Sequence, residues 1–170
     1  MLRPNNSSKL ATMTSTTKEN EANSVQVTSL FERIGGEEFI EAAVEEYNTR
    51  VHSDPDLARF FEGVDNRRLK RHERRFFTMA FSGKLPANVG QRLMRAHERL
   101  FVDMGLNAKH FDAVIYRHFV DTLKHLDVDA ELVEESLAVL SPLRPVFEEG
   151  YQRHYVSKST ETEKEEEKKD

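Results

Sequence analysis

Gln91–Leu100 reads QRLMRAHERL. As a helix, this segment places Leu93, His97 and Leu100 in one apolar line, because residues three and four positions apart share a helix face. Met94 flanks that line, and the arginines lie outside it. An imidazole on an apolar face is either a core histidine with hydrogen-bonded nitrogens or a metal ligand, and neutral imidazole is a common ligand of iron. The segment alone leaves both interpretations open.

A second predicted helix, Leu69–Phe81, also carries a histidine on its apolar face. The residues that share this face are Leu69, His72, Glu73, Phe76, Phe77 and Ala80. Most Lys and Arg residues of this helix fall on its other faces, and we interpret them as a solvated surface. His72 and Glu73 are unusual within an apolar stripe, since an unpaired buried carboxylate is costly. This helix is therefore the second candidate for contributing a ligand.

The composition limits the class of protein. A chain of 170 residues fits one domain with a real core. Because it lacks cysteine, it has no disulfides, zinc–thiolate sites or thiol nucleophiles. The net charge of −5 and the mixed signs argue against nucleic acid as the main partner. No apolar run approaches the roughly 18 residues of a membrane span, so we expect a soluble protein with no membrane partner.

Capping and turn residues divide the chain into helices. Thr28 or Ser29 can cap a short helix that ends at the paired glycines 35 and 36. Further helices are predicted at 37–52, 66–81, 91–104, 107–126 and 129–147. Pro55 opens a short turn after the first of these, and Pro142 and Pro145 should kink or fray the last. No strand pattern is present, so the predicted fold class is all-α.

Composition also predicts three segments. Residues 1–27 form a disordered tail, residues 28–150 form the helical domain, and residues 151–170 form a charged, largely disordered tail. Up to residue 17 the first tail contains Arg3 and Lys9 but no acidic residue. Organelle transit peptides likewise carry basic residues and few acidic ones. It has no Arg-rich amphipathic helix, however, so we expect a cytoplasmic protein.

Two helices that each present a histidine from an apolar face suggest a flat apolar ligand held by a metal. Phe60 and Phe61, on a nearby tight turn, would supply aromatic surface. Haem fits this description, because its iron takes axial imidazole and its macrocycle needs an apolar slot. A di-iron bundle would need paired Glu-x-x-His motifs. None of the seven histidines here has Glu three residues before it.

Five segments of the chain follow the pattern of a known family. They are 29–36 (SLFERIGG), 54–61 (DPDLARFF), 76–83 (FFTMAFSG), 94–97 (MRAH) and 105–114 (GLNAKHFDAV). With these segments the chain resembles the truncated, two-over-two haemoglobins of the N-type (group I) class over about residues 29–147. The glycine pair, Phe61 and His97 together make the resemblance specific. It implies a truncated globin-like sandwich of helices that encloses a haem.

The resemblance assigns roles residue by residue. It makes His97 the proximal iron ligand and Phe61 the ring packed against the haem face. Leu69, His72 and Glu73 fall on the distal helix positions that face a ligand, and His72 is the candidate for a second iron ligand. The other predicted haem contacts are Phe76, Phe77 and Met94.

The chain departs from the family pattern at three positions. Asn48 stands where relatives carry a ligand-stabilising Tyr, and Tyr47 precedes it where they usually carry Phe. We predict Asn48 as the donor to the ligand, with Tyr47 in support. Glu73 stands where many relatives have Gln, and it can donate only if burial keeps it protonated. Pro145 stands near the place of a His that bonds covalently to haem in some relatives, so we expect noncovalent haem b.

The resemblance implies a haem protein that binds dioxygen, nitric oxide and carbon monoxide. With an unidentified reductase, such a protein can also act as a nitric oxide dioxygenase. Two other classes stay open at this point. One is a redox or gas sensor, or an electron-transfer protein, in which His72 and His97 both bind iron. The other is a haem-free helical interaction domain. An absorption spectrum separates all three.

Overall fold

A computed structural model of the chain describes residues 28–156. No strand occurs among these residues, and the predicted all-α class is confirmed. The first elements are α1 (Leu30–Arg33), α2 (Gly36–His52), α3 (Pro55–Ala58), the 3-10 turn η1 (Arg59–Phe61), α4 (Asn66–Phe81) and α5 (Val89–Met104). Within the same described range, no helix is both long and apolar enough to cross a membrane.

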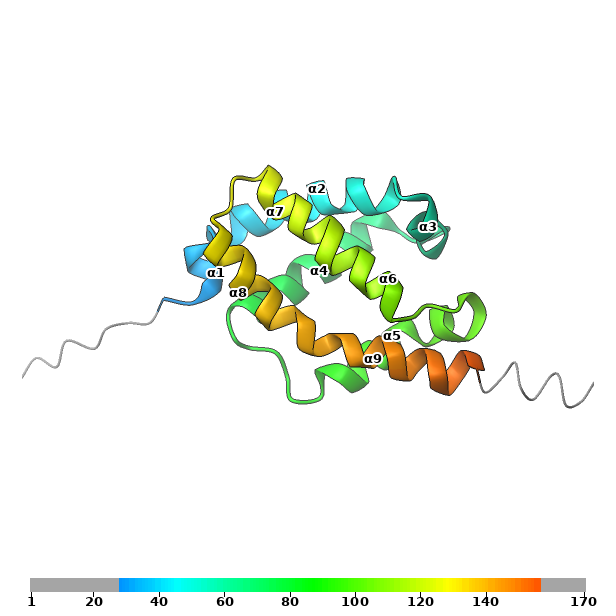
Figure 1. Cartoon of the computed structure of the whole chain (residues 1–170). Helices are drawn as coiled ribbons and strands as arrows, with labels where there is room; N and C mark the ends of the chain where they lie inside the picture. Colours follow the sequence, from blue (N-terminus) through cyan, green and yellow to red (C-terminus); the bar gives the residue numbers. More distant parts are fainter. Residues whose placement is uncertain (1–27, 157–170) are drawn as a thin grey trace, which may run out of the picture.

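The second half of the domain consists of two long helical rods. The first joins α6 (Ala108–Asp112), the π-helical η2 (Ala113–Phe119) and α7 (Val120–His125). The second joins α8 (Ala130–Leu140), the 3-10 turn η3 (Ser141–Leu143), α9 (Arg144–Gly150) and the π-helical η4 (Tyr151–Val156). The two rods run side by side, with α6 against α9 and α7 against α8 (Figure 1).

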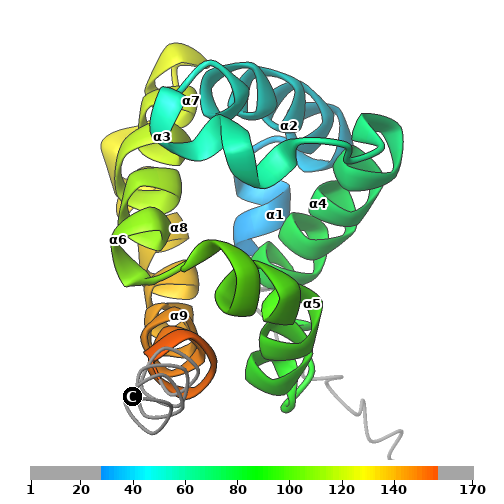
Figure 2. The same ribbon diagram turned by 90° about the vertical axis from the view of Figure 1, so that its right-hand side faces the viewer.

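The helices form two pairs. One pair is α2 packed on α4, and the other is the two rods, which α2 contacts through α7 and η2. In Figure 2, α2 lies at the top, α4 and α5 lie on the right, and α6 to α9 lie on the left. This arrangement is the two-over-two sandwich that the family resemblance implied. The site described below is built from residues of two packed helix pairs, α2 with α4 and α5 with α9.

The helix ends follow the local capping chemistry read from the sequence. Ser29 and Glu32 form a capping box at α1, in which the Ser29 amide donates to the Glu32 carboxylate at 2.9 Å. Asp65 accepts from the first backbone amides of α4, and Asn107 caps α6. Gly105 ends α5 with φ +66°, a left-handed conformation that favours glycine.

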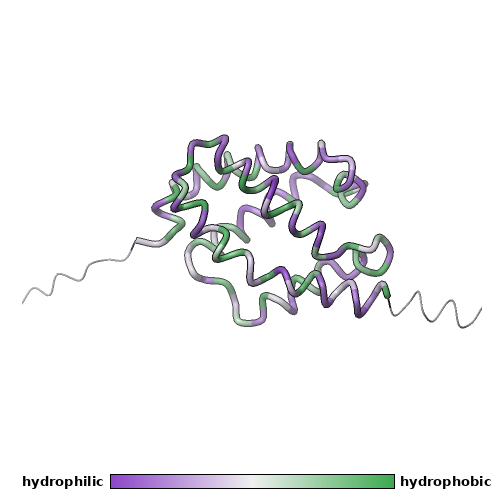
Figure 3. Tube along the Cα trace, viewed as in Figure 1, coloured by the Kyte–Doolittle hydropathy of each residue, from purple (hydrophilic) through white to green (hydrophobic). Residues whose placement is uncertain are grey.

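The core lies between the two helix pairs. Figure 3 shows hydrophilic and hydrophobic residues alternating along the helices, as amphipathic helices require. The largest fully buried hydrophobic side chains are Phe101, Phe119, Ile40, Leu57, Leu123 and Leu140. The Phe77 ring stacks on Phe119 with centroids 5.1 Å apart, which joins α4 to the first rod.

The end of the last helix differs from the prediction. Pro142 lies in η3 and Pro145 opens α9, so the prolines interrupt the helix as expected. The helix then continues through Gly150 to Val156, although the sequence placed its end near Phe147 and the domain boundary at 150. Gly150 is a buried contact residue here and not a helix terminator. The predictions for residues 1–27 and 157–170 lie outside the described residues.

Candidate functional site

His97 lies on α5 with one ring nitrogen committed to the backbone. Its Nδ1 lies 2.9 Å from the carbonyl oxygen of Leu93, one turn earlier. A carbonyl can only accept, so Nδ1 carries the hydrogen and Nε2 keeps its lone pair. Burial lowers the pKa of His97, which holds the ring neutral. The chain thus fixes the tautomer and orientation that a metal-ligating imidazole needs.

Aromatic rings of α5 and α9 pack against the His97 imidazole. The Phe147 ring of α9 lies 5.3 Å from the imidazole, and the Phe101 ring of α5 lies 6.3 Å from it, centroid to centroid. Phe111 of α6 packs on Phe147 at 5.0 Å. Phe101 is fully buried, and α9 reaches it so closely at Gly150 that a Cβ there would lie 2.5 Å from its ring. Three helices therefore fix the position of this imidazole.

Asn48 and Glu73 connect α2 to α4. Asn48 is buried, and its amide nitrogen donates to the Val44 carbonyl at 2.8 Å and to the Glu73 carboxylate at 2.5 Å. An amide nitrogen has only two hydrogens. Both are thus donated within the protein, which leaves Asn48 no free hydrogen for a ligand in this conformation.

The pKa values of Tyr47 and Glu73 are both raised above their ordinary values. Burial raises the pKa of the Tyr47 hydroxyl, and the nearby Glu73 carboxylate adds to that shift. Burial also raises the pKa of Glu73, against the hydrogen bond from Asn48, which lowers it. The rings around Tyr47 are Phe77 and Phe119, both edge-on at 6.1 and 6.3 Å. No hydrogen bond joins the Tyr47 hydroxyl to any residue between 28 and 156.

The remaining predicted residues fall into three groups. Phe61, Leu69, Phe76 and Met94 are half-buried, with apolar surface still accessible. Phe77 is 5% exposed and belongs to the core. The His72 side chain is exposed on α4 and makes no hydrogen bond to the described residues.

Two residues of the site were missed from the sequence. Phe147 was not among the predicted haem contacts, yet its ring packs on His97. His52 was not among the candidate site residues, but its ring lies 4.7 Å from Phe61 and its Nε2 is buried without a hydrogen-bond partner among the described residues. His52 follows Asn48 by one turn of α2. That spacing is a signal that would have pointed to the same side of the helix.

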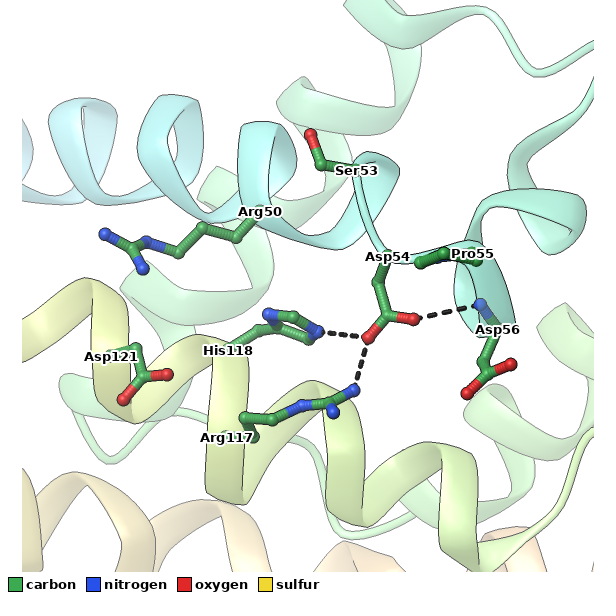
Figure 4. Close-up of a pocket in the computed structure, with 8 residues that line it drawn as sticks. All are labelled: Arg50, Ser53, Asp54, Pro55, Asp56, Arg117, His118 and Asp121. Carbon is green, nitrogen blue, oxygen red and sulfur yellow. Dashed lines mark hydrogen bonds and ion pairs between the residues drawn. The ribbon is translucent and has the colours of Figure 1, made fainter.

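A separate surface pocket lies where α2, α3 and the first rod meet (Figure 4). Its volume is about 490 Å³. Asp54 accepts from His118 Nε2 at 2.7 Å, from the Asp56 amide at 2.9 Å and from the Arg117 guanidinium. The hydrogen bond from His118 is the main reason that the pKa of Asp54 lies below its ordinary value. This cluster fastens α3 to the first rod.

Comparison with known proteins identifies the family. A family described as bacterial-like globin matches residues 29–148. Group 1 truncated haemoglobins from Synechocystis and from Mycolicibacterium paratuberculosis are each 34% identical to the chain, over 113 and 122 residues. The chain is a group 1 truncated haemoglobin. The matches cover 66% and 72% of this truncated haemoglobin and 90% and 85% of those relatives.

Solved structures agree with this identification. The crystal structure of Chlamydomonas reinhardtii THB4 is 38% identical, with a TM-score of 0.63 over 71% of this chain and 94% of that chain. The 2/2 haemoglobin from Synechococcus, solved with covalently attached haem, is 32% identical, with a TM-score of 0.64 over 71% of this chain and 98% of that one. The resemblance and the two-over-two fold read from the sequence are confirmed.

The residues of this truncated haemoglobin fit a haem. His97 offers one neutral nitrogen lone pair, and its other nitrogen is satisfied by Leu93. Phe61, Phe76 and Met94 leave accessible apolar surface on the surrounding elements, as the faces of a macrocycle require. When bound, the haem supplies an iron centre for diatomic ligands. The protein supplies its ligation, the polarity around it and the access to it.

Proposed function

We propose that this truncated haemoglobin reversibly binds dioxygen, nitric oxide and carbon monoxide at a haem b held noncovalently by His97. The observation that carries the proposal is the Nδ1 hydrogen bond from His97 to the Leu93 carbonyl, which leaves Nε2 unprotonated and oriented. Noncovalent binding is supported by the absence of cysteine and by Pro145, which has no side-chain nucleophile. Extraction of the haem into acidified organic solvent tests this part.

Replacement of His97 tests the ligand assignment. His97→Gly should abolish the wild-type absorption spectrum of the haem-loaded protein, and added imidazole should restore it in part. His110→Gly is the matched control, because His110 is also half-buried but accepts the Asn107 amide at Nδ1 and belongs to the α6 cap. A His97→Gly variant with a wild-type spectrum would overturn the assignment.

We infer that Tyr47 donates to the bound ligand and that Asn48 positions Glu73. The raised pKa of Tyr47 keeps its hydroxyl protonated, and that hydroxyl donates to no described residue. The amide hydrogens of Asn48 are already used. This reverses the roles expected from the sequence. Tyr47→Phe should therefore speed dioxygen dissociation about tenfold or more, the factor for a lost hydrogen bond of about 1.5–3 kcal/mol. Asn48→Ala should have the smaller effect, and the opposite order would restore the first assignment.

The same site supports nitric oxide dioxygenation. In that reaction nitric oxide and dioxygen combine, and with one electron they leave as nitrate. The electron must come from a reductase, because no residue of the site supplies it at each turnover. Consumption of nitric oxide by the oxygenated protein, measured with an electrode against nitrate formed, tests this activity. Nitric oxide loss without an equal yield of nitrate would contradict it.

A further inference from the structure

The net charge of the chain hides a strong segregation. Residues 66–104, which span α4 and α5, contain ten Lys and Arg but only three Asp and Glu. The rest of the chain contains fifteen Lys and Arg and twenty-seven Asp and Glu. The expectation of mixed charges without a basic field therefore holds for the whole chain but not for this part. A local field of this kind attracts partners of opposite charge.

Four of these ten basic residues share one exposed arc of α4. Arg67, Arg71 and Arg75 follow one another at four-residue intervals, with Arg68 in the next row, and all four are exposed. We call these four residues the cationic α4 face. Like charges four apart repel and destabilise an isolated helix by about 0.2–0.5 kcal/mol per pair. The row is therefore not explained by helix stability.

None of these four arginines has a carboxylate partner among residues 28–156, and the same holds for Arg59, Arg92 and Arg95. The arginines outside α4 and α5 that pair with a carboxylate are Arg33, Arg50, Arg117, Arg144 and Arg153. On the flank of α4 that faces α2, Lys70 and Arg74 pair with Glu41 and Glu45. Carboxylates thus neutralise the flank packed on α2 and leave the exposed arc charged.

The cationic α4 face borders the candidate haem site. His72, one turn after Arg68, is exposed at its edge, while Leu69 and Glu73 of the same helix turn inward. Figure 2 shows α4 on the opposite side of the domain from α6 and α7. A protein that docks on this face thus comes close to the haem.

We propose that the cationic α4 face docks an acidic electron-transfer protein that reduces this haemoglobin. The proposal rests on the proposed nitric oxide dioxygenation, which consumes one electron per turnover. One electron leaves the reduced centre of the donor and converts ferric haem to ferrous haem, with no bond made or broken. Electrostatic complementarity of this kind mainly raises the association rate and depends on ionic strength.

The test uses the full haem-loaded chain and an acidic [2Fe–2S] ferredoxin as the probe. Calorimetric titration at low salt should give a complex that weakens as sodium chloride is raised. Arg71→Gln with Arg75→Gln should weaken it about three- to tenfold and slow reduction by the pre-reduced ferredoxin by a similar factor. Reduction by dithionite and dioxygen binding should stay at wild-type values, which separates a failure of docking from a failure of the proposed function.

Lys109→Gln with Lys124→Gln is the matched control. It removes the same two charges from exposed positions of α6 and α7, on the opposite side of the domain. This control should bind ferredoxin within a factor of two of wild type. Equal losses in the two double variants, or affinity that does not depend on salt, would overturn the proposal. A third result would also overturn it. If binding to phosphatidylserine vesicles requires Arg71 and Arg75 but binding to ferredoxin does not, the cationic α4 face recognises a membrane surface and not a protein.

Discussion

The replacement Gly150→Ala measures how closely α9 is pressed against α5. An ideal Cβ at Gly150 would lie 2.5 Å from Cε2, 2.6 Å from Cζ and 2.8 Å from Cδ2 of Phe101, all shorter than real Cβ contacts. Phe101 is 0% exposed and packs against Phe147 and His97, so its ring has no free space to enter. The added methyl group must push the two helices apart.

The expected loss follows from two opposing effects. Overpacking a core costs about 1–3 kcal/mol, whereas replacing Gly by Ala within a helix contributes about 1 kcal/mol in favour of folding. The added Cβ would come too close to three atoms of one rigid, fully buried ring. The overpacking cost should therefore lie at the upper end of that range. We expect a net loss of about 2 kcal/mol, which lowers Tm by about 4–8 °C for a chain of this size.

Gly90→Ala is the matched control for this prediction. Gly90 lies on α5 and also faces α9, but a Cβ there would meet Val146 at 3.4 Å, an ordinary contact. This variant should gain helix propensity without overpacking, so its Tm should equal or exceed that of the wild type. Thermal unfolding followed by circular dichroism measures both. A Gly150→Ala protein that melts at or above the Gly90→Ala protein would refute the packing argument.

Three further replacements test other contacts. Burial raises the pKa of Glu73, so the folded state binds its proton more tightly than the unfolded state and stability falls as the pH rises from the ordinary carboxyl range through the raised pKa. In urea unfolding between pH 4 and 8, the free energy of unfolding of Glu73→Gln should not show that fall. Equal pH dependence of the free energy of unfolding in the wild type and in Glu73→Gln would contradict the prediction. Asp54→Ala should cost about 1–2 kcal/mol through the lost α3 cap and the lost His118 contact, with little loss in Asp56→Ala. His72→Leu should speed carbon monoxide capture, because no described residue restrains that ring from competing for the iron; unchanged capture would show that it points elsewhere.

Features governed by neighbouring residues were predictable from the sequence. Ser29, Asp65 and Asn107 cap helices because a short polar side chain reaches backbone amides two or three residues ahead. His97 was likewise found from helix periodicity, and its hydrogen bond to Leu93 is also local, four residues back along the same helix. Such interactions need no knowledge of how the helices pack.

Features that depend on packing between distant segments were not predictable in this way. Gly150 was predicted only as the last residue of the domain, but the close approach of Phe101, forty-nine residues earlier, requires a residue without a side chain there. Asn48 looked like a free donor, but Glu73 of another helix accepts one of its hydrogens. The role of Phe147 against His97 likewise depends on where α9 crosses α5. In each case the deciding partner lies on another helix.

The interruption at η3 has a consequence for how the protein acquires its cofactor. Pro142 and Pro145 carry no amide hydrogen, so the hydrogen-bond ladder between α8 and α9 is broken there. Because segments on either side of such a break can open separately, we expect α9 and η4 to open while α8 stays packed. Phe147 lies on the unit that opens, and its departure uncovers His97. We therefore expect haem exchange to follow the local opening of α9, so that a variant that loosens α9 exchanges haem faster at unchanged global stability.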